Sequence, residues 1–212
     1  MNIEHIKPYD IEKRSMEIIE SEMGVASHLT EAERLIVKRV IHTTADFDYL
    51  KNLRFSENAA EIGLQALRSG TVIITDTNMS LAGISKPALK ALGCEAYCFT
   101  ADSDVSAAAK SNGTTRAVAA VDKAAMLYGQ QKFIYAVGNA PTALIRLHEL
   151  ITEKKISPAL IIGVPVGFVN VVYSKELIMT ADVPYIVAEG RKGGSTVSAA
   201  ICNALLYQLY KR

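Results

Sequence analysis

The chain has 212 residues, half of them hydrophobic, with 23 Lys and Arg against 22 Asp and Glu. A chain of this length buries roughly 70% of its unfolded surface, which suffices for one domain without disulfides or a structural metal. The formal net charge of +1 excludes a global attraction to nucleic acid or to an anionic membrane surface. We therefore expect a single domain over residues 1–212, with any charged ligand site confined to a local patch.

The apolar residues are spread over short runs, none of them near the roughly 20 residues needed to cross a bilayer. The N-terminus lacks the apolar core of a signal peptide. The spacing of Cys94, Cys98 and Cys202 matches neither a zinc site nor a disulfide framework. These features predict a cytoplasmic protein with reduced thiols and no metal site of its own.

Helical patterns dominate the first third of the chain. Apolar residues recur with helical spacing over residues 9–23. Thr30 followed by Glu33 is a capping-box pattern, and an apolar stripe follows it. We expect a third helix that is capped by Ser56 and ends at Gly70.

From residue 71 onward, short β-branched runs alternate with helical patterns. Such alternation is typical of a parallel sheet covered by helices, and nearly continuous apolar strands favour it over a half-exposed antiparallel sheet. We therefore predict an α/β fold with three layers, α/β/α, a mostly parallel five-stranded sheet and the helical N-terminal third packed on it. The five expected strands cover residues 71–75, 94–99, 132–137, 159–164 and 183–188.

The loops that follow the strands are the expected binding region. Right-handed crossovers place the carboxyl ends of parallel strands along one edge, so the loops at 76–78, 138–142, 163–167 and 190–195 should be neighbours. In the last loop Arg191 and Lys192 precede a helix start at Ser195, a pair suited to carboxylates or phosphates. Gly-rich turns can also be simple tight connections. No loop has a dinucleotide or phosphate-loop pattern, which argues against NAD or ATP.

Three further residues stand out for their chemistry. His42 closes the second helix among polar neighbours, and histidine is the usual general acid or base near neutral pH. A helix-capping histidine without a catalytic role is the alternative interpretation. Arg116 stands at an expected helix start, where an anionic ligand or partner would explain a cation. Asp76 ends a strand without His or Cys at metal-ligand spacing, and loop capping explains it.

Seven motifs, in order along nearly the whole chain, resemble those of the precorrin-8X methylmutase family of cobalamin biosynthesis, which includes the cobalt-precorrin-8 methylmutases. Seven motifs in order are far more specific than any single one. They are EKRS at 12–15, KRVIHTTADFD at 38–48, TDTNM at 75–79, GTTR at 113–116, GNAPTAL at 138–144, GVPVGFV at 163–169 and GRKGGS at 190–195.

The resemblance implies an isomerase, an intramolecular transferase that moves a methyl group from C-11 to C-12 of a contracted tetrapyrrole to give cobyrinate or hydrogenobyrinate. It implies that His42 is the general acid and that Ser15, Arg39 and Arg116 bind the substrate. It also implies a homodimer with the site near the subunit interface. The run from Ile41 to Leu50 is more similar to the anaerobic members, in which cobalt arrives within the substrate and no cofactor is required.

A substrate with many carboxylates needs fixed guanidinium groups and N–H donors. We therefore expect Arg39, Arg116, Arg191 and Lys192 to form a basic cluster at one edge of the sheet. Two alternatives remain open: a corrinoid carrier without catalysis and, less favoured, a nucleotide-dependent α/β enzyme. No partnership with nucleic acid or membrane is expected. The full set of expected substrate contacts is Ser15, Arg39, Thr43, Asp76, Arg116, Asn139, Arg191, Lys192 and Ser195.

Overall fold

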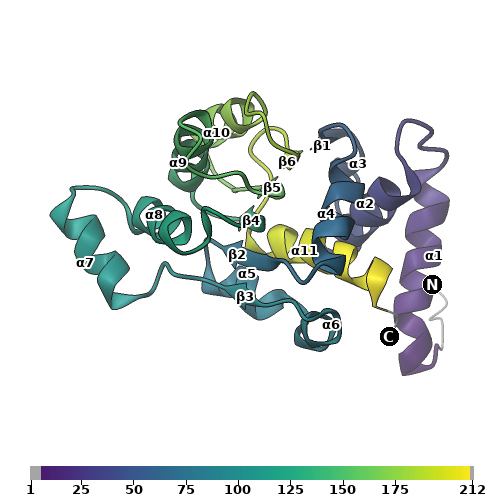
Figure 1. The fold of residues 1–212 in the computed structure, drawn as a ribbon. Helices are drawn as coiled ribbons and strands as arrows, with labels where there is room; N and C mark the ends of the chain where they lie inside the picture. Colours follow the sequence, from purple (N-terminus) through teal and green to yellow (C-terminus); the bar gives the residue numbers. More distant parts are fainter. Residues whose placement is uncertain (1–5, 211–212) are drawn as a thin grey trace.

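The computed structural model describes residues 6–210, which form a six-stranded sheet between helices (Figure 1). The order across the sheet is β1-β6-β5-β4-β2-β3, and every neighbouring pair is parallel except β1 with β6. The expected α/β class and its five strands are confirmed. The strands are β1 (Leu53–Phe55), β2 (Val72–Thr75), β3 (Ala96–Tyr97), β4 (Phe133–Val137), β5 (Leu160–Gly163) and β6 (Tyr185–Ala188).

The edge strand β1 corrects the expected number of strands from five to six. It has three residues, too few to show the alternation that reveals a strand, and it exists because its backbone pairs antiparallel with β6. Ser56 lies directly after it. Its side chain accepts a 2.9 Å hydrogen bond from the backbone N–H of Tyr185, so Ser56 fastens this edge instead of capping the next helix, which begins at Ala59.

The remaining described elements are helices, and the expected capping box at Thr30 and Glu33 is confirmed. None of the helices within residues 6–210 is long and apolar enough to cross a membrane. Their bounds are η1 (Pro8–Asp10), α1 (Ile11–Met23), α2 (Glu31–Thr44), α3 (Tyr49–Asn52), α4 (Ala59–Arg68), α5 (Asn78–Gly83), α6 (Lys86–Leu92), α7 (Ser103–Ser111), α8 (Arg116–Tyr128), α9 (Pro141–Thr152), α10 (Val171–Ile178) and α11 (Ser195–Leu209).

The sheet divides the interior into two hydrophobic cores. Successive strand residues alternate between them: in β4, Ile134 and Ala136 face the core shared with α2, α4 and α11, whereas Phe133, Tyr135 and Val137 face the core shared with α8 and α9. All five residues of β4 are buried, because a strand in the middle of a three-layer fold has no solvent face. This arrangement accounts for the near-continuous apolar strands in the sequence.

The helical N-terminal third reaches the sheet in layers. Helix α4 packs directly on β4, β5 and β6, whereas α2 packs mainly against α11, and α1 packs against α2. Figure 1 shows α1 at one end of the molecule and α7 projecting at the other. The expected packing of the N-terminal third on the sheet is therefore direct for α4 only. His42 lies in the last turn of α2, and the segment after it reaches the β6–α11 loop at the carboxyl edge of the sheet.

Candidate active site

His42 and Ser15 line the same cavity. His42 is half-buried in the last turn of α2, and Ser15 is half-buried on α1, which packs along α2. The Ser15 hydroxyl donates a 2.9 Å hydrogen bond to the carbonyl of Ile11, which leaves its oxygen able to accept one. The cavity has a volume of about 280 Å³ and is lined by Ser15, Ile18, Ile19, Glu22, Ile41, His42, Ala45 and Phe47.

Arg39 lies one turn before His42 and lines a second cavity, of about 260 Å³, between α1, α2 and α11. Its guanidinium donates a 2.8 Å hydrogen bond to the Glu12 carboxylate and lies 5.1 Å from the centre of the Tyr207 ring. Thr43, which is exposed, donates its hydroxyl proton to the carbonyl of Arg39. Arg39 is therefore held beside the His42 cavity by an acid and an aromatic ring.

The loops that follow β2, β4, β5 and β6 meet at the carboxyl edge of the sheet, which confirms that they are neighbours. The Thr77 and Ser195 hydroxyl oxygens are 2.8 Å apart, and the N–H of Gly194 donates to the carbonyl of Val164. A Cβ on Gly138 would lie 2.7 Å from the Cα of Ser195, so glycine is what allows the β4 loop to approach the start of α11.

Asp76 lies beneath this edge and not on its surface. Its side chain is 2% exposed, and its two oxygens accept 2.8 Å hydrogen bonds from the backbone N–H groups of Gly138, Asn139 and Ala140. Burial raises the pKa of Asp76, and these hydrogen bonds oppose the increase. Asp76 therefore holds the β4–α9 loop through three of its N–H groups, while a direct contact of Asp76 with substrate stays a prediction.

Of the four cations that were expected to cluster, Lys192 is neutralised by acids and Arg191 is not far from it in the same loop. The Lys192 Nζ lies 2.6 Å from a carboxylate oxygen of Asp46 and 2.6 Å from one of Asp48, and these contacts raise the pKa of Lys192. They also tie the β6–α11 loop to the segment that follows His42. Arg191 is exposed, with its guanidinium 5.3 Å from the centre of the Phe168 ring. Arg191 and Lys192 thus share one loop, whereas Arg39 belongs to α2.

Arg116 is exposed as the first residue of α8, next to the β4–α9 loop. The hydroxyl of the preceding Thr115 lies 3.0 Å from that of Thr142, which joins the start of α8 to the start of α9. Asn139 is exposed in the same loop, and its side chain is not part of the Asp76 hydrogen bonds. The structure therefore brings Arg116 and Asn139 to the surface of the carboxyl edge.

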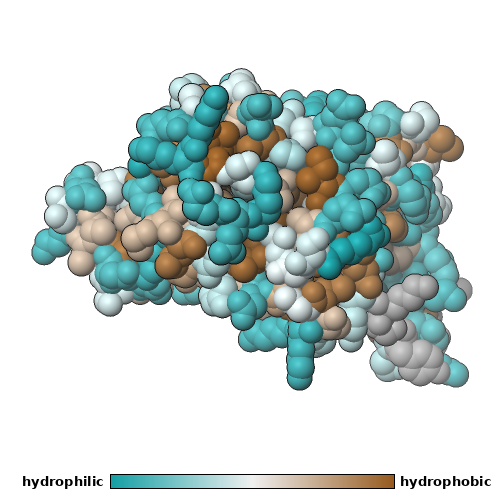
Figure 2. Space-filling model, viewed as in Figure 1, coloured by the Kyte–Doolittle hydropathy of each residue, from teal (hydrophilic) through white to brown (hydrophobic). Residues whose placement is uncertain are grey.

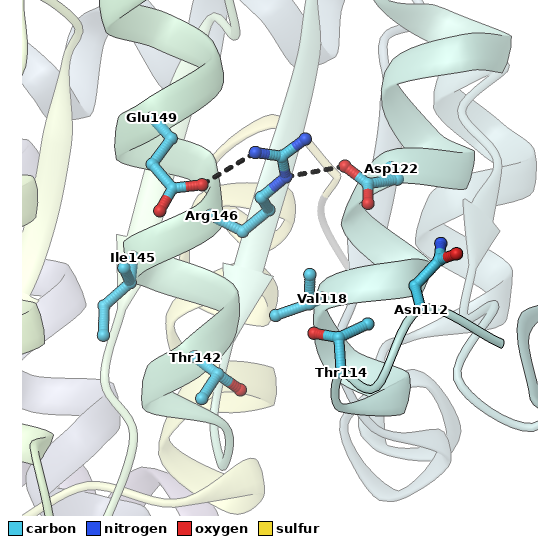
Figure 3. A pocket seen from close by; sticks show the side chains of 8 residues that line it. All are labelled: Asn112, Thr114, Val118, Asp122, Thr142, Ile145, Arg146 and Glu149. Atoms are coloured by element: carbon cyan, nitrogen blue, oxygen red, sulfur yellow. Dashed lines mark hydrogen bonds and ion pairs between the residues drawn. The ribbon is translucent and has the colours of Figure 1, made fainter. Parts of the chain in front are cut away.

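A cavity of about 350 Å³ opens between α8 and α9 (Figure 3). Its cation, Arg146, is held between the helices by hydrogen bonds of 2.7 Å to Asp122 and 2.7 Å to Glu149. Burial and these two acids have opposite effects, and the acids prevail to raise the pKa of Arg146. Because Asp122 belongs to α8 and Glu149 to α9, Arg146 serves to hold the two helices together.

Large hydrophobic side chains are exposed near the loops of the carboxyl edge. Figure 2 shows hydrophobic patches reaching the surface among hydrophilic side chains. Next to the site, the exposed apolar residues belong to the β5–α10 loop, to α10 and to α5, and such side chains suit the flat face of a ring or a protein partner. They are Met79, Val166, Phe168, Val169 and Tyr173.

Cys94 and Cys202 are buried free thiols, and burial raises the pKa of Cys202 to about 12. Within residues 6–210, no three His, Cys, Asp or Glu side chains gather as a set of metal ligands.

Sequence reasoning missed three residues that the structure places at the site. Glu22 lines the His42 cavity, and Thr77 bonds to Ser195. Lys175, on α10, is buried and donates hydrogen bonds to the β6–α11 loop. Thr77 lies within the TDTNM motif, so a signal existed for it. A lysine in an amphipathic helix is normally predicted to face solvent, and the residues around Lys175 in the sequence give no sign that it is buried.

The fold and the site together define an α/β protein whose ligand region lies at the carboxyl edge of a mostly parallel sheet, with a histidine and a serine sharing one cavity. The precorrin-8X methylmutase family model matches residues 10–208 of the chain. The chain belongs to the precorrin-8X methylmutase family, and it is a methylmutase, an intramolecular transferase.

Individual relatives cover nearly the whole chain. It is 45% identical to a cobalt-precorrin-8 methylmutase of Salmonella typhimurium, over 96% of this chain and 96% of that protein. It is 44% identical to a cobalt-precorrin-8 methylmutase of Leptospira interrogans, over 96% of this chain and 94% of that protein. The crystal structure of the precorrin-8X methylmutase from Thermus thermophilus is similar, with a TM-score of 0.83 and 42% identity, over 93% of this chain and 96% of that one.

Proposed function

We propose that the protein converts cobalt-precorrin-8 to cobyrinate in cobalamin biosynthesis by moving a methyl group from C-11 to C-12 of the macrocycle. The observation that carries the proposal is the cavity that His42 and Ser15 share, because histidine is the usual general acid near neutral pH. The ion pairs of Lys192 with Asp46 and Asp48, just after His42, support a position of this cavity beside the β6–α11 loop. The names of the Salmonella and Leptospira relatives support cobalt-precorrin-8 over the metal-free compound as the substrate.

In this mechanism His42 is the catalytic residue. Its imidazolium gives a proton to a ring C nitrogen, or to a position conjugated with it, which makes the macrocycle electron-poor. The C-11 to methyl bond then breaks as the C-12 to methyl bond forms in a suprafacial 1,5 shift. The proton returns to His42 at the end, so the reaction consumes no other reactant. Cobalt, where present, enters as part of the substrate.

Substrate binding divides between charged and apolar groups. The substrate carboxylates would pair with the guanidinium groups of Arg39, Arg116 and Arg191, since planar guanidinium groups bind carboxylates with two hydrogen bonds. Exposed hydrophobic residues such as Phe168 suit the faces of the macrocycle. Lys192 would contribute positive charge while it stays paired with Asp46 and Asp48. The polar contacts would come from Ser15, Thr43, Asn139 and Ser195.

We also propose that the protein acts as a homodimer with the site near the interface. The exposed apolar side chains of Val166, Phe168 and Val169 on one loop support a surface that a second copy covers. The single domain over residues 1–212 and the cytoplasmic location stay predictions. Light scattering of the purified protein should give twice the mass of one chain, and a monomer at micromolar concentration would contradict the dimer.

The test of the proposed function follows the position of a labelled methyl group. Purified protein is mixed separately with cobalt-precorrin-8 and with precorrin-8, each carrying carbon-13 in the C-11 methyl, and the products are read by NMR. We expect the label at C-12 in both products, with faster conversion of the cobalt compound. A label that stays at C-11 while the protein binds the compound would support the corrinoid carrier instead. A rise of the melting temperature with ATP or NAD would support the nucleotide-dependent alternative.

A further inference from the structure

Lys175 is a buried lysine whose ammonium group has no acidic partner among residues 6–210. Its side chain lies in α10 and is 1% exposed, and its Nζ donates 2.8 Å hydrogen bonds to the backbone carbonyls of Gly190 and Lys192. Burial lowers the pKa of Lys175 to about 8. Because burying an ammonium group is costly, a lysine in this position needs the two carbonyls to offset the loss of water.

The two carbonyls belong to a loop that has little rigidity of its own. Gly190, Gly193 and Gly194 all have positive φ angles, and glycines leave a chain many conformations to lose on ordering. The carbonyl of Arg191, between the two that Lys175 binds, accepts a hydrogen bond from the N–H of Gly167. Three consecutive carbonyls of the loop are therefore turned inward and held, two of them by one side chain.

The Arg191 side chain, in the middle of these three residues, is exposed. The guanidinium lies over the Phe168 ring at the carboxyl edge, and the Lys192 ammonium next to it reaches Asp46 in the segment after His42. We propose that Lys175 is a positioning residue that orders the β6–α11 loop and thereby aims Arg191 at a carboxylate of the substrate. The proposal rests on the proposed function for the nature of the ligand.

The test measures the Kd for cobyrinate by absorbance titration of the purified full-length protein. Lys175→Met keeps the length of the side chain but removes both donors. We expect it to raise Kd by about tenfold, because the loop must be ordered when the ligand binds. Arg191→Ala should raise Kd at least as much. The double variant should bind no more weakly than Arg191→Ala alone, since Lys175 acts through Arg191.

Glu176→Gln is the matched control, because this exposed neighbour of Lys175 on α10 should leave Kd unchanged. Thermal unfolding verifies that each variant is folded. If Lys175→Met does not fold, Lys175→Gln, which retains an N–H donor, should fold and bind with an intermediate Kd. Wild-type affinity in a folded Lys175→Met protein, effects that multiply in the double variant, or failure of both substitutions to fold would each overturn the proposal.

The same titration separates this inference from the proposed function. Kd for cobyrinate can be measured whether or not the protein moves a methyl group. A protein that binds cobyrinate with the expected Lys175 dependence but leaves the label at C-11 would retain the positioning role and lose the methylmutase mechanism. Where turnover is observed, Lys175→Met should raise KM by about the same factor as Kd and change kcat by less than about threefold.

Discussion

Replacing His42 by Gln should lower the rate of methyl migration by about 10²- to 10⁴-fold, the usual contribution of a positioned general acid. Glutamine can hydrogen bond but cannot deliver a proton to the macrocycle. The side chain is half-buried at the end of α2, so its loss should leave a folded protein that binds cobyrinate with nearly unchanged Kd. Single-turnover conversion of the labelled substrate, followed by NMR, measures the rate.

His148→Gln is the matched control for this experiment. His148 is also a half-buried histidine on a helix, and its Nε2 lies 3.3 Å from the hydroxyl of Thr180. It lies on α9, outside the cavity of His42 and Ser15. We expect the His148 variant to convert substrate at the wild-type rate. Full turnover by the His42 variant would remove His42 from the mechanism.

Replacing Asp76 by Asn should destabilise the protein by about 2–4 kcal/mol, the range for leaving buried donors without an acceptor. One oxygen of the carboxylate binds the N–H of Gly138 and the other binds the N–H groups of Asn139 and Ala140. An amide keeps one acceptor oxygen and turns an NH₂ group toward the remaining donors. Urea unfolding curves of the two proteins, fitted with one shared m value, measure the loss in free energy of unfolding.

Asp102→Asn provides the comparison for Asp76. Asp102 also follows a strand, but its side chain is 38% exposed and pairs with the Lys123 ammonium. Water can solvate the Lys123 ammonium that this substitution leaves unpaired. The loss of unfolding free energy should therefore be clearly smaller for Asp102→Asn than for Asp76→Asn. Equal losses of unfolding free energy for the two variants would show that the three backbone hydrogen bonds of Asp76 contribute little.

The Asp76 variant should also have a raised KM, because a displaced β4–α9 loop would move Asn139 and its neighbour Arg116.

Local patterns in the sequence predicted most of the architecture. Alternating strands and helices indicate a covered parallel sheet, and the capping box at Thr30 locates the start of the helix that ends near His42. Local patterns failed where structure depends on distant pairing. Strand β1 forms only against β6, and Ser56 is bound to Tyr185, 129 residues away, in preference to its own helix.

The candidate site divides in a similar way. Motifs identified His42, Ser15 and the four loops, and the fold placed the loops together as the topology of a parallel sheet requires. The partners of the charged residues were not predictable. Lys192 is bound by Asp46 and Asp48, and Arg39 by Glu12, because helices and loops distant in the sequence bring acids to them. Cations around the site are thus paired with acids, as expected for a chain whose positive and negative residues nearly balance.

By itself the sequence determined the α/β class, the loops at the carboxyl edge of the sheet and the membership of a methylmutase family, because periodicity and ordered motifs are properties of consecutive residues. Only the tertiary structure decided which of the polar groups reach the surface and which hold the loops. Asp76 and Lys175 are buried beneath the edge with backbone partners, whereas Arg116 and Arg191 reach the surface. Burial and hydrogen-bond partners arise from packing between distant segments, and no local pattern encodes them.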